Sequence, residues 1–269
     1  MDRHTLLTPT VVEPLLRGRF GRPYLWVESC ASTQDLLRDP GFPEGAVAVT
    51  EHQTAGRGRA GRGWEDIAGS SLLCSLLLRP DEARPVQQLS LVAGLAVAET
   101  VEESRDAAGI KWPNDVLLRG RKVAGVLLES SGGVVVCGIG INVSQAEGEL
   151  PAATPVPAGS LGSVTGHAPD RTELLATLLE VLEHRYDAWR GSGLAPMLDE
   201  LEARNVLRGR RVEVGGEHGV AEHIAGDGRL ALRRSDGTAV LVGSGEIRCP
   251  TSVGHQRRMD APRTPDVSD

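Results

Sequence analysis

The sequence predicts an α+β protein, in which a mixed sheet with helices is followed by a small β-barrel. Short segments rich in β-branched residues alternate with two long segments of helical periodicity between residues 24 and 189. Gly-Gly and Asp-Gly turns punctuate an alternating pattern in residues 210–248, which predicts a small antiparallel barrel. A chain of 269 residues with 40% hydrophobic content is large enough to bury a substantial core.

The elements of the first part follow in order along the chain. Residues 1–25 are a lead-in with one short helix. Brevity and β-branched content predict strands at residues 46–50, 71–78, 110–112, 116–118, 123–129 and 134–139. Apolar residues at helical spacing predict helices over residues 86–104 and 171–189. A hairpin turn is expected at 119–121, and residues 151–158 form a Pro/Ala-rich loop.

The chain divides into three parts. A main domain is expected over residues 1–205, and a short helix near residues 195–204 closes it. A barrel of about five strands follows over residues 206–249. Residues 250–269 are polar, contain prolines and have almost no apolar content, which predicts a disordered tail.

Composition excludes several classes of protein. The net charge of −7 argues against a general affinity for nucleic acid. Cys30, Cys74, Cys137 and Cys249 are scattered without a CxxC pair, as expected for reduced, mostly buried thiols rather than for disulfides or a zinc site. The sequence contains no apolar run of ~18 residues and no signal-peptide pattern at Met1, so we expect a soluble, cytoplasmic protein.

Lysine is almost absent from the chain. Lys111 and Lys122 are the only two lysines, and the other 27 of the 29 basic residues are arginines. Lysine is a compact point charge with rotatable donors, whereas arginine is a planar fork. The two lysines therefore suit an anion whose geometry changes during a reaction. The alternative explanation is coding bias, with two lysines left by chance.

A glycine- and arginine-rich segment, GRGRAGRGW, occupies residues 56–64 and is called the Gly-Arg loop below. It contains GxGxxG, but a strand rather than a helix is predicted after Trp64, which argues against a dinucleotide-binding turn. We expect a mobile loop whose amides and guanidinium groups surround an anion, with Trp64 folding down as a lid. The alternative is a solvated basic loop.

Two motifs contain the lysines. KWPND at residues 111–115 places an ammonium, an amide and a carboxylate at a strand end, an arrangement suited to phosphates and Mg²⁺. RKVAGVLLE at 121–129 places Lys122 at the start of a buried strand, with a small Ala-Gly pair where a ligand can approach closely. Alternatively, KWPND is only a structural turn, and Lys122 is a charge that prevents another strand from pairing with the edge of the sheet.

Two further motifs contain small or hydroxyl side chains. GIGINV at residues 138–143 leaves room for a flat ring or a nucleotide against a strand, although a glycine-kinked core strand is equally compatible. STQD at 32–35 is expected foremost to cap a short helix, with Ser32 at the N-cap. Its hydroxyls could also hold a polar group of a ligand.

The order of these motifs, STQ, QTAGRGRAGRGW, KWPND, KVAGVLLE and GIGINV, resembles the catalytic core of biotin protein ligases. The resemblance covers about residues 26–143, and the barrel is similar to the C-terminal domain of that family. It implies a catalytic core of the class II synthetase-like type and an SH3-like barrel. The family first joins biotin to ATP as biotinyl-5'-AMP, releasing pyrophosphate, and then transfers biotin to one lysine of a biotin carboxyl carrier protein of an acyl-CoA carboxylase.

The resemblance also assigns roles to residues, all carried by matched motif positions. Lys122, Arg57 and Arg59 would be catalytic. The expected contacts of biotin are Ser32, Thr33, Gln53, Gly56, Arg57, Arg59, Lys122, Gly125 and Gly138. The expected contacts of ATP or the adenylate are Arg57, Arg59, Arg62, Trp64, Lys111, Asn114 and Asn142. Mg²⁺ would accompany ATP, with Asp115 as its ligand. Cys30 and His52 are expected to be structural.

Two other functions are compatible with these motifs. A lipoate or octanoate ligase or transferase of the same fold, or a non-catalytic biotin-binding protein, would share much of the pattern. Because only about 25 residues precede the matched region, we expect a short form without a DNA-binding domain, binding neither nucleic acid nor membrane. A monomer or a weak homodimer is expected. A chain with so few lysines also offers few targets for self-modification.

Overall fold

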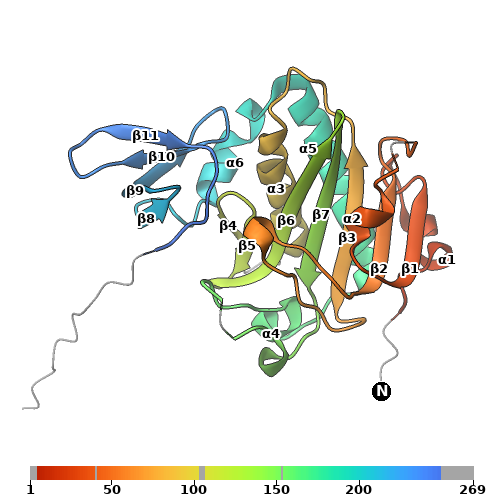
Figure 1. Ribbon diagram of the computed structural model, residues 1–269. Helices are drawn as coiled ribbons and strands as arrows, with labels where there is room; N and C mark the ends of the chain where they lie inside the picture. The colour runs from red at the N-terminus through yellow and green to blue at the C-terminus, as the bar shows by residue number, and fades with distance from the viewer. Residues whose placement is uncertain (1–4, 40, 103–106, 153, 250–269) are drawn as a thin grey trace, which may run out of the picture.

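The computed structural model describes residues 5–39, 41–102, 107–152 and 154–249. A seven-stranded sheet in the order β1-β2-β3-β7-β6-β5-β4 forms its centre (Figure 1). The strands are β1 (Tyr24–Cys30), β2 (Val47–Gln53), β3 (Ser71–Leu78), β4 (Gly109–Lys111), β5 (Asp115–Leu118), β6 (Arg121–Ser131) and β7 (Val134–Asn142). β1 and β2 are parallel and the other neighbours are antiparallel, so the predicted mixed sheet is confirmed.

Two long helices cover one face of this sheet. The α-helices in the described residues are α1 (Pro9–Val12), α2 (Thr33–Leu36), α3 (Leu89–Val101), α4 (Leu161–Thr165), α5 (Arg171–Ser192) and α6 (Leu198–Ala203). α3 and α5 lie side by side behind the sheet in Figure 1, while the short α2 lies on the opposite face. α3 is apolar on nearly all sides and almost wholly buried, as expected for a helix packed between a sheet and a second helix.

Local signals define the start of α5. The carboxylate of Asp170 accepts hydrogen bonds from the backbone N–H groups of Thr172 (2.7 Å) and Glu173 (3.1 Å), which caps the helix. The helix then buries one face, from Leu174 to Trp189, against α3 and the sheet. The predicted helix at 171–189 is therefore confirmed, with three more residues at its C-terminal end.

The prediction differs from the structure in two places and is confirmed in a third. β1 was not predicted, because this edge strand pairs on one side only and its residues have no clear alternation of polar and apolar types. The predicted helix at 86–104 begins with the single 3₁₀ turn Val86–Gln88, and residues 103 and 104 lie outside the described ranges. The predicted hairpin turn is confirmed: Arg119 and Gly120 both have positive φ (47° and 78°).

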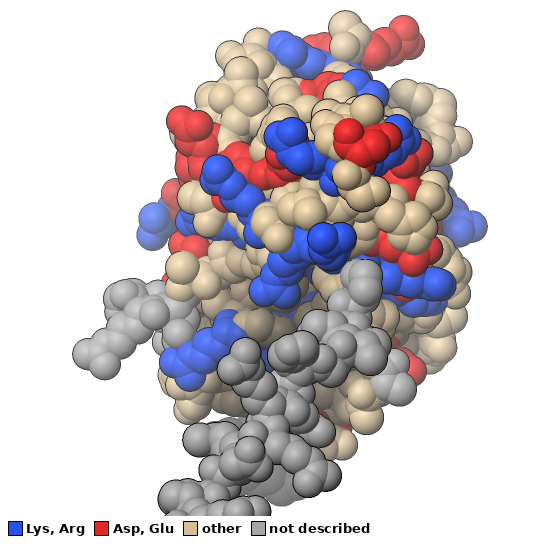
Figure 2. Space-filling view, turned by 90° about the vertical axis from the view of Figure 1, so that its left-hand side faces the viewer, with Lys and Arg blue, Asp and Glu red and all other residues tan. Residues whose placement is uncertain are grey.

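A small antiparallel sheet follows the main sheet. It consists of β8 (Arg211–Val214), β9 (Glu217–Ile224), β10 (Leu230–Arg233) and β11 (Ala239–Val242), in the order β11-β10-β9-β8. The expectation of about five strands is wrong for the described residues, because the segment after β11 pairs with β8 only through the bridge between Glu213 and Arg248. Basic and acidic side chains are interspersed over much of this side of the molecule (Figure 2).

Further expectations concern the ends of the chain and its thiols. The predicted tail, residues 250–269, lies outside the described residues, and the boundary at 205 stays a prediction. All four cysteines are free: Cys74 and Cys137 are buried, Cys30 is half-buried and Cys249 is exposed. Among the described residues, no helix combines the length and apolar character needed to cross a membrane.

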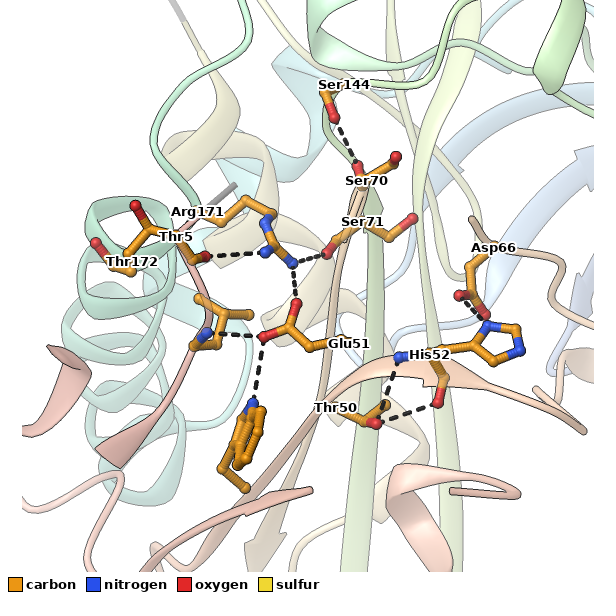
Figure 3. Close-up of polar contacts among 12 residues, drawn as sticks. Thr5, Thr50, Glu51, His52, Asp66, Ser70, Ser71, Ser144, Arg171 and Thr172 are labelled. Atoms are coloured by element: carbon orange, nitrogen blue, oxygen red, sulfur yellow. Dashed lines mark hydrogen bonds and ion pairs between the residues drawn. The ribbon is translucent and has the colours of Figure 1, made fainter. Parts of the chain in front are cut away.

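A buried ion pair connects the N-terminal segment to the sheet and to α5 (Figure 3). Arg171 Nη1 donates to Glu51 Oε2 (2.7 Å), and both side chains are 5% exposed. The same arginine donates to the carbonyl oxygens of Ser71 (3.0 Å) and Thr5 (3.0 Å). Glu51 Oε1 accepts from Leu7 N (2.8 Å) and from Trp26 Nε1 (3.2 Å). Every charge in this group is hydrogen-bonded, so the pair tolerates burial.

Replacing Arg171 by methionine leaves the Glu51 carboxylate buried without its counter-charge. We expect the free energy of unfolding to fall by about 3–5 kcal/mol, as for other buried pairs that lose one partner. Urea denaturation measures this change. Arg233→Met is the matched control, because it breaks an exposed pair with Glu222, and exposed pairs contribute about 0–1 kcal/mol. Equal losses in the two variants would contradict the structural importance of the buried pair.

Candidate active site

A cavity of about 430 Å³ opens on the face of the main sheet that carries α2, opposite α3 and α5. Segments far apart in the sequence form its walls: α2 with Ser32, the end of β2, the Gly-Arg loop, the strands β4 to β7, and residues 154–156 and 245–247. The small C-terminal part of the chain therefore contributes to the same cavity as the main sheet. A volume of this size is in the range of small-molecule sites.

Glycines make the floor of the cavity flat. Gly125 of β6 and Gly140 of β7 are directly paired across the two strands. The indole of Trp64 lies against both: a Cβ added to Gly140 would come within 2.6 Å of Trp64 Cε2, and one added to Gly125 within 3.2 Å of Cζ3. Only glycine permits this approach. The expected room for a flat ring is thus present, and in this structure a ring of the chain itself occupies it.

Polar groups from α2 and β2 form one end of the cavity. Thr33 donates its backbone N–H to Gln53 Oε1 (2.9 Å), and its hydroxyl lies 2.7 Å from that of Ser75. Ser32 is 2% exposed and occupies the N-cap of α2, but its side chain makes no capping hydrogen bond. The expectation that it caps the helix is therefore wrong. The hydroxyl of Ser32, a residue that lines the cavity, is not used for a cap.

The base of the Gly-Arg loop is held by one buried carboxylate. Asp66 Oδ1 accepts from the backbone N–H of Gln53 (3.2 Å), and Oδ2 lies 2.9 Å from His52 Nδ1 (Figure 3). The side chain of Asp66 is fully buried, whereas that of His52 is 39% exposed. Two backbone hydrogen bonds join the two arms of the loop: Trp64 N donates to Gly56 O (2.9 Å) and Gly58 N donates to Arg62 O (2.7 Å). The expected structural role of His52 agrees with this contact.

The basic side chains of the cavity come from three stretches of chain. Lys122 Nζ lies 2.7 Å from Asp115 Oδ1 and 5.7 Å from the centre of the Trp64 ring. Arg59 donates to the neutral amide oxygen of Asn114 (3.3 Å), and burial lowers the pKa of its guanidinium. Arg62 reaches across to Glu246 (2.7 Å) in the C-terminal part. Lys122 and Arg62 thus have carboxylate partners within the chain, with which a bound anion would compete, whereas Arg59 contacts only a neutral amide.

Most of the predicted site residues meet in this cavity. Its lining includes Ser32, Thr33, Gln53, Arg57, Arg59, Arg62, Trp64, Lys111, Asn114, Asp115, Lys122, Gly125 and Gly138. Two predicted residues do not line it. Gly56 lies at the loop base, where its carbonyl accepts from Trp64 N. Asn142 is buried and donates to Gly159 O (3.0 Å), which fixes the segment after β7.

Sequence reasoning missed several residues that line the cavity. Gln34 fills the space in front of Gly138 and donates to Leu127 O (3.1 Å), and only its position beside Thr33 could have suggested this role. Glu246 and its neighbours Gly245 and Ile247 come from the small C-terminal part. No local pattern marks them, because they reach the site only through the packing of the two sheets.

The cavity offers no thiol nucleophile. Cys74 is the cysteine in its lining, and burial raises the pKa of this thiol to about 12. Cys30, at the end of β1, also has its pKa raised by burial. A thiolate is the reactive form, so these thiols stay unreactive near neutral pH. The chemistry of the site therefore depends on hydrogen-bonding groups and fixed positive charge.

Comparison with known proteins agrees with this arrangement. The sequence profile described as the biotin/lipoate A/B protein ligase family matches residues 26–145. A biotin–[acetyl-CoA-carboxylase] ligase of Mycobacterium tuberculosis is 41% identical over 217 residues, which are 76% of this chain and 79% of the relative. This chain belongs to the biotin/lipoate A/B protein ligase family.

Two further members of the family are similar over most of their length. A biotin–[acetyl-CoA-carboxylase] ligase of Paracoccus denitrificans is 38% identical over 230 residues, covering 78% of this chain and 93% of the relative. The structure of the Aquifex aeolicus biotin protein ligase in complex with biotin and ATP superposes with a TM-score of 0.75 and 32% identity. That match covers 83% of this chain and 96% of the other. The fold is thus that of the family's catalytic core followed by a small β-domain.

Gly140→Ala tests the flat floor of the cavity. The new methyl group would overlap the Trp64 ring, so the ring must leave and the Gly-Arg loop must loosen. We expect amide hydrogen exchange in residues 56–64 to become about tenfold faster, equivalent to ~1.4 kcal/mol of lost contact. Gly148→Ala is the control, because nothing lies within 4 Å of its added Cβ. Unchanged exchange in the Gly140 variant would show that the ring does not depend on this glycine.

Proposed function

We propose that this chain is an ATP-dependent biotin–protein ligase. In the first reaction a biotin carboxylate oxygen attacks the α-phosphorus of ATP, and the bond to the departing pyrophosphate breaks. In the second, the amine of a lysine on a biotin carboxyl carrier protein attacks the acyl carbon, and AMP leaves. The observation that supports the proposal most strongly is the gathering of a polar pocket end, a glycine floor and several cations in one cavity.

Biotin fits the polar end and the floor of the cavity. Its ureido head both donates and accepts hydrogen bonds, and an unpaired polar group in a buried site costs about 1–3 kcal/mol. Ser32, Thr33 and Gln53 offer hydroxyl and amide groups for this head. The backbones of Gly125 and Gly138 would line the pocket for its apolar remainder, which requires the Trp64 ring and the Gln34 side chain to move away from them. The backbone of the loop at Gly56 and Arg57 would close over biotin.

The cations suit the first reaction because it brings two anions together. Two unit charges about 4 Å apart interact by ~4 kcal/mol at an effective dielectric constant of 20, so one well-placed cation lowers the barrier strongly. Lys122 would bridge the biotin carboxylate and the α-phosphate once it leaves Asp115. Arg59 and Arg62 would hold the phosphates and the adenylate, with Lys111 and Asn114 beside them and Trp64 as a cover. Asn142, which lies outside the cavity lining, would act indirectly.

A magnesium ion would enter with ATP. No group of three or more His, Cys, Asp or Glu side chains in the described residues could hold a metal alone. Mg²⁺ bound to a nucleotide takes most of its ligands from phosphate and water and needs only one or two carboxylates. Asp115 supplies one such carboxylate beside Asn114, so the residues fit this role. When bound, Mg²⁺ would neutralise phosphate charge.

The partners of the protein follow from the same reaction. The acceptor lysine belongs to a carrier domain of an acyl-CoA carboxylase, so the chain needs no nucleophile of its own. We propose a cytoplasmic enzyme that acts as a monomer or a weak homodimer and binds neither nucleic acid nor membrane. Lys111 and Lys122 both line the cavity, which leaves no surface lysine among the described residues for self-biotinylation.

Transfer of labelled biotin to a biotin carboxyl carrier domain tests the function. Lys122→Ala should lower the rate of adenylate formation by at least about 100-fold, the usual loss when one group that stabilises a transition state is removed. Lys122→Arg should retain only part of the wild-type rate, because a planar guanidinium cannot replace the compact charge of an ammonium. Pyrophosphate release with biotin and with lipoate, compared in parallel, distinguishes the two substrates.

Arg17→Ala is the control for loss of positive charge, because the Arg17 side chain is 79% exposed and is not part of the cavity lining. This variant should transfer biotin at the wild-type rate. Lipoate-dependent pyrophosphate release without biotin-dependent release would refute the proposed substrate. Unchanged transfer by the Lys122→Ala variant would refute the proposed role of the lysine.

A further inference from the structure

A side chain takes over from a strand at the end of β2. β3 pairs with β2 from Val47 to Thr50, whereas β1 pairs with β2 as far as Gln53. Beyond Thr50, the backbone N–H of Gln53 donates its hydrogen bond to Asp66 Oδ1, at 3.2 Å. The carboxylate of Asp66 thus occupies the place of a strand carbonyl and satisfies a backbone donor that the sheet ladder no longer serves.

His52 holds the second oxygen of this carboxylate. Asp66 Oδ2 lies 2.9 Å from His52 Nδ1. An ionised carboxylate only accepts hydrogen bonds, so Nδ1 is the donor in this contact. The side chain of Asp66 is fully buried, and a buried carboxylate needs a donor for its oxygens. The His52 ring and the Gln53 N–H supply one donor each, so the carboxylate is fixed in direction as well as in position.

Gln53 connects this carboxylate to the polar end of the cavity. Its Oε1 accepts from the backbone N–H of Thr33 at 2.9 Å and lies 3.3 Å from Thr33 Oγ1. The hydroxyl of Thr33 in turn lies 2.7 Å from that of Ser75. Gln53 and Thr33 line the cavity, whereas His52 and Asp66 are described residues outside its lining. The buried carboxylate therefore reaches a ligand through Gln53.

The segment that carries Asp66 is attached to the sheet independently of the Gly-Arg loop. Asp66 follows residues 56–64 in the chain, and the residues after it have backbone hydrogen bonds of their own. Gly69 N donates to Glu51 O (3.1 Å), and Val143 N donates to Ser70 O (3.1 Å). The loop can therefore open or close while Asp66 stays beside the end of β2.

We propose that Asp66 and His52 are positioning residues that aim the side chain of Gln53 at the ureido ring of biotin. The choice of ligand rests on the proposed function, whereas the contact between Asp66 and Gln53 does not. A ureido ring presents its donors and its acceptor in fixed directions, so a small displacement of Gln53 weakens its binding. The proposed contacts of ATP lie on other segments of the chain. Loss of Asp66 should therefore reduce the affinity for biotin and spare that for ATP.

Titration calorimetry of the free protein with biotin tests this inference. Asp66→Ala removes the acceptor of the Gln53 N–H and should weaken biotin binding by about tenfold, the effect of about one lost hydrogen bond. ATP affinity, measured in the same way, should change by less than about twofold. Asp66→Asn should lose no more than about threefold, because its amide can accept from Gln53 and donate to the other tautomer of His52. Glu65→Ala, which removes an exposed neighbouring carboxylate outside the cavity lining, is the matched control and should bind biotin like the wild type.

A second pair of variants keeps the test decisive if Asp66→Ala does not fold. His52→Phe keeps a ring but removes the donor to Asp66, and should weaken biotin binding by about three- to tenfold. His52→Asn places an amide N–H near the position of Nδ1 and should retain most of the affinity. Wild-type biotin affinity in Asp66→Ala and His52→Phe would overturn the inference. Equal losses of biotin and ATP affinity would also overturn it, because they indicate a general disruption of the cavity.

A double-variant cycle decides whether Asp66 acts through Gln53. Asp66→Ala combined with Gln53→Ala should bind biotin no more weakly than Gln53→Ala alone, because both changes remove the same contact. Additive losses would contradict a role through Gln53.

Hydrogen exchange at the Gln53 amide keeps this inference apart from the proposed function, because it needs no ligand. Asp66→Ala should speed that exchange by about tenfold. Wild-type protein that binds no biotin would refute the proposed function and the ligand named here, while faster exchange in the variant would still support the fixing of Gln53. Biotin binding by the wild type together with unchanged exchange in Asp66→Ala would support the function and refute the positioning.

Discussion

The arrangement of the cavity depends on how positive charge is kept in a half-buried space. A cation there without a counter-charge is costly, as the lowered pKa of Arg59 shows, and three of the others have carboxylate partners. Lys122 has Asp115, Arg57 has Asp35 and Glu129, and Arg62 has Glu246. These pairs differ in strength and geometry. Lys122 and Arg62, each with one carboxylate partner, are suited to exchange that partner for a phosphate or carboxylate of a ligand.

The same logic connects charge to shape. Trp64 can lie flat against the sheet because Gly125 and Gly140 have no side chains, and the ring then lies near the ammonium of Lys122. The loop that carries Trp64 is held at its base by Asp66 and along one arm by Arg57. A loop so rich in glycine loses much conformational entropy on ordering. Side-chain contacts to the loop offset that cost.

Away from the cavity, the Glu51–Arg171 pair connects the N-terminal segment, the central strands and α5. Glu51 lies two residues before Gln53, so the contact that stabilises the core also fixes the strand end that forms the polar part of the cavity. In the same stretch of β2, the hydroxyl of Thr50 donates a hydrogen bond to the backbone carbonyl of His52 (3.1 Å). Stability of the core and geometry of the site therefore share the same short stretch of β2.

The sequence by itself determined the local elements and the identity of the site. Helical spacing of apolar residues located α3 and α5, and brevity and β-branched content located six strands of the main sheet. The lysines, the Gly-Arg loop and the glycines of β7 marked the cavity, because each motif has a composition that ordinary packing does not require. Only the tertiary structure decided the edge strand β1, the contribution of Glu246 and the partners of each cation. Those depend on contacts between residues up to 184 positions apart, and no local pattern records such pairings.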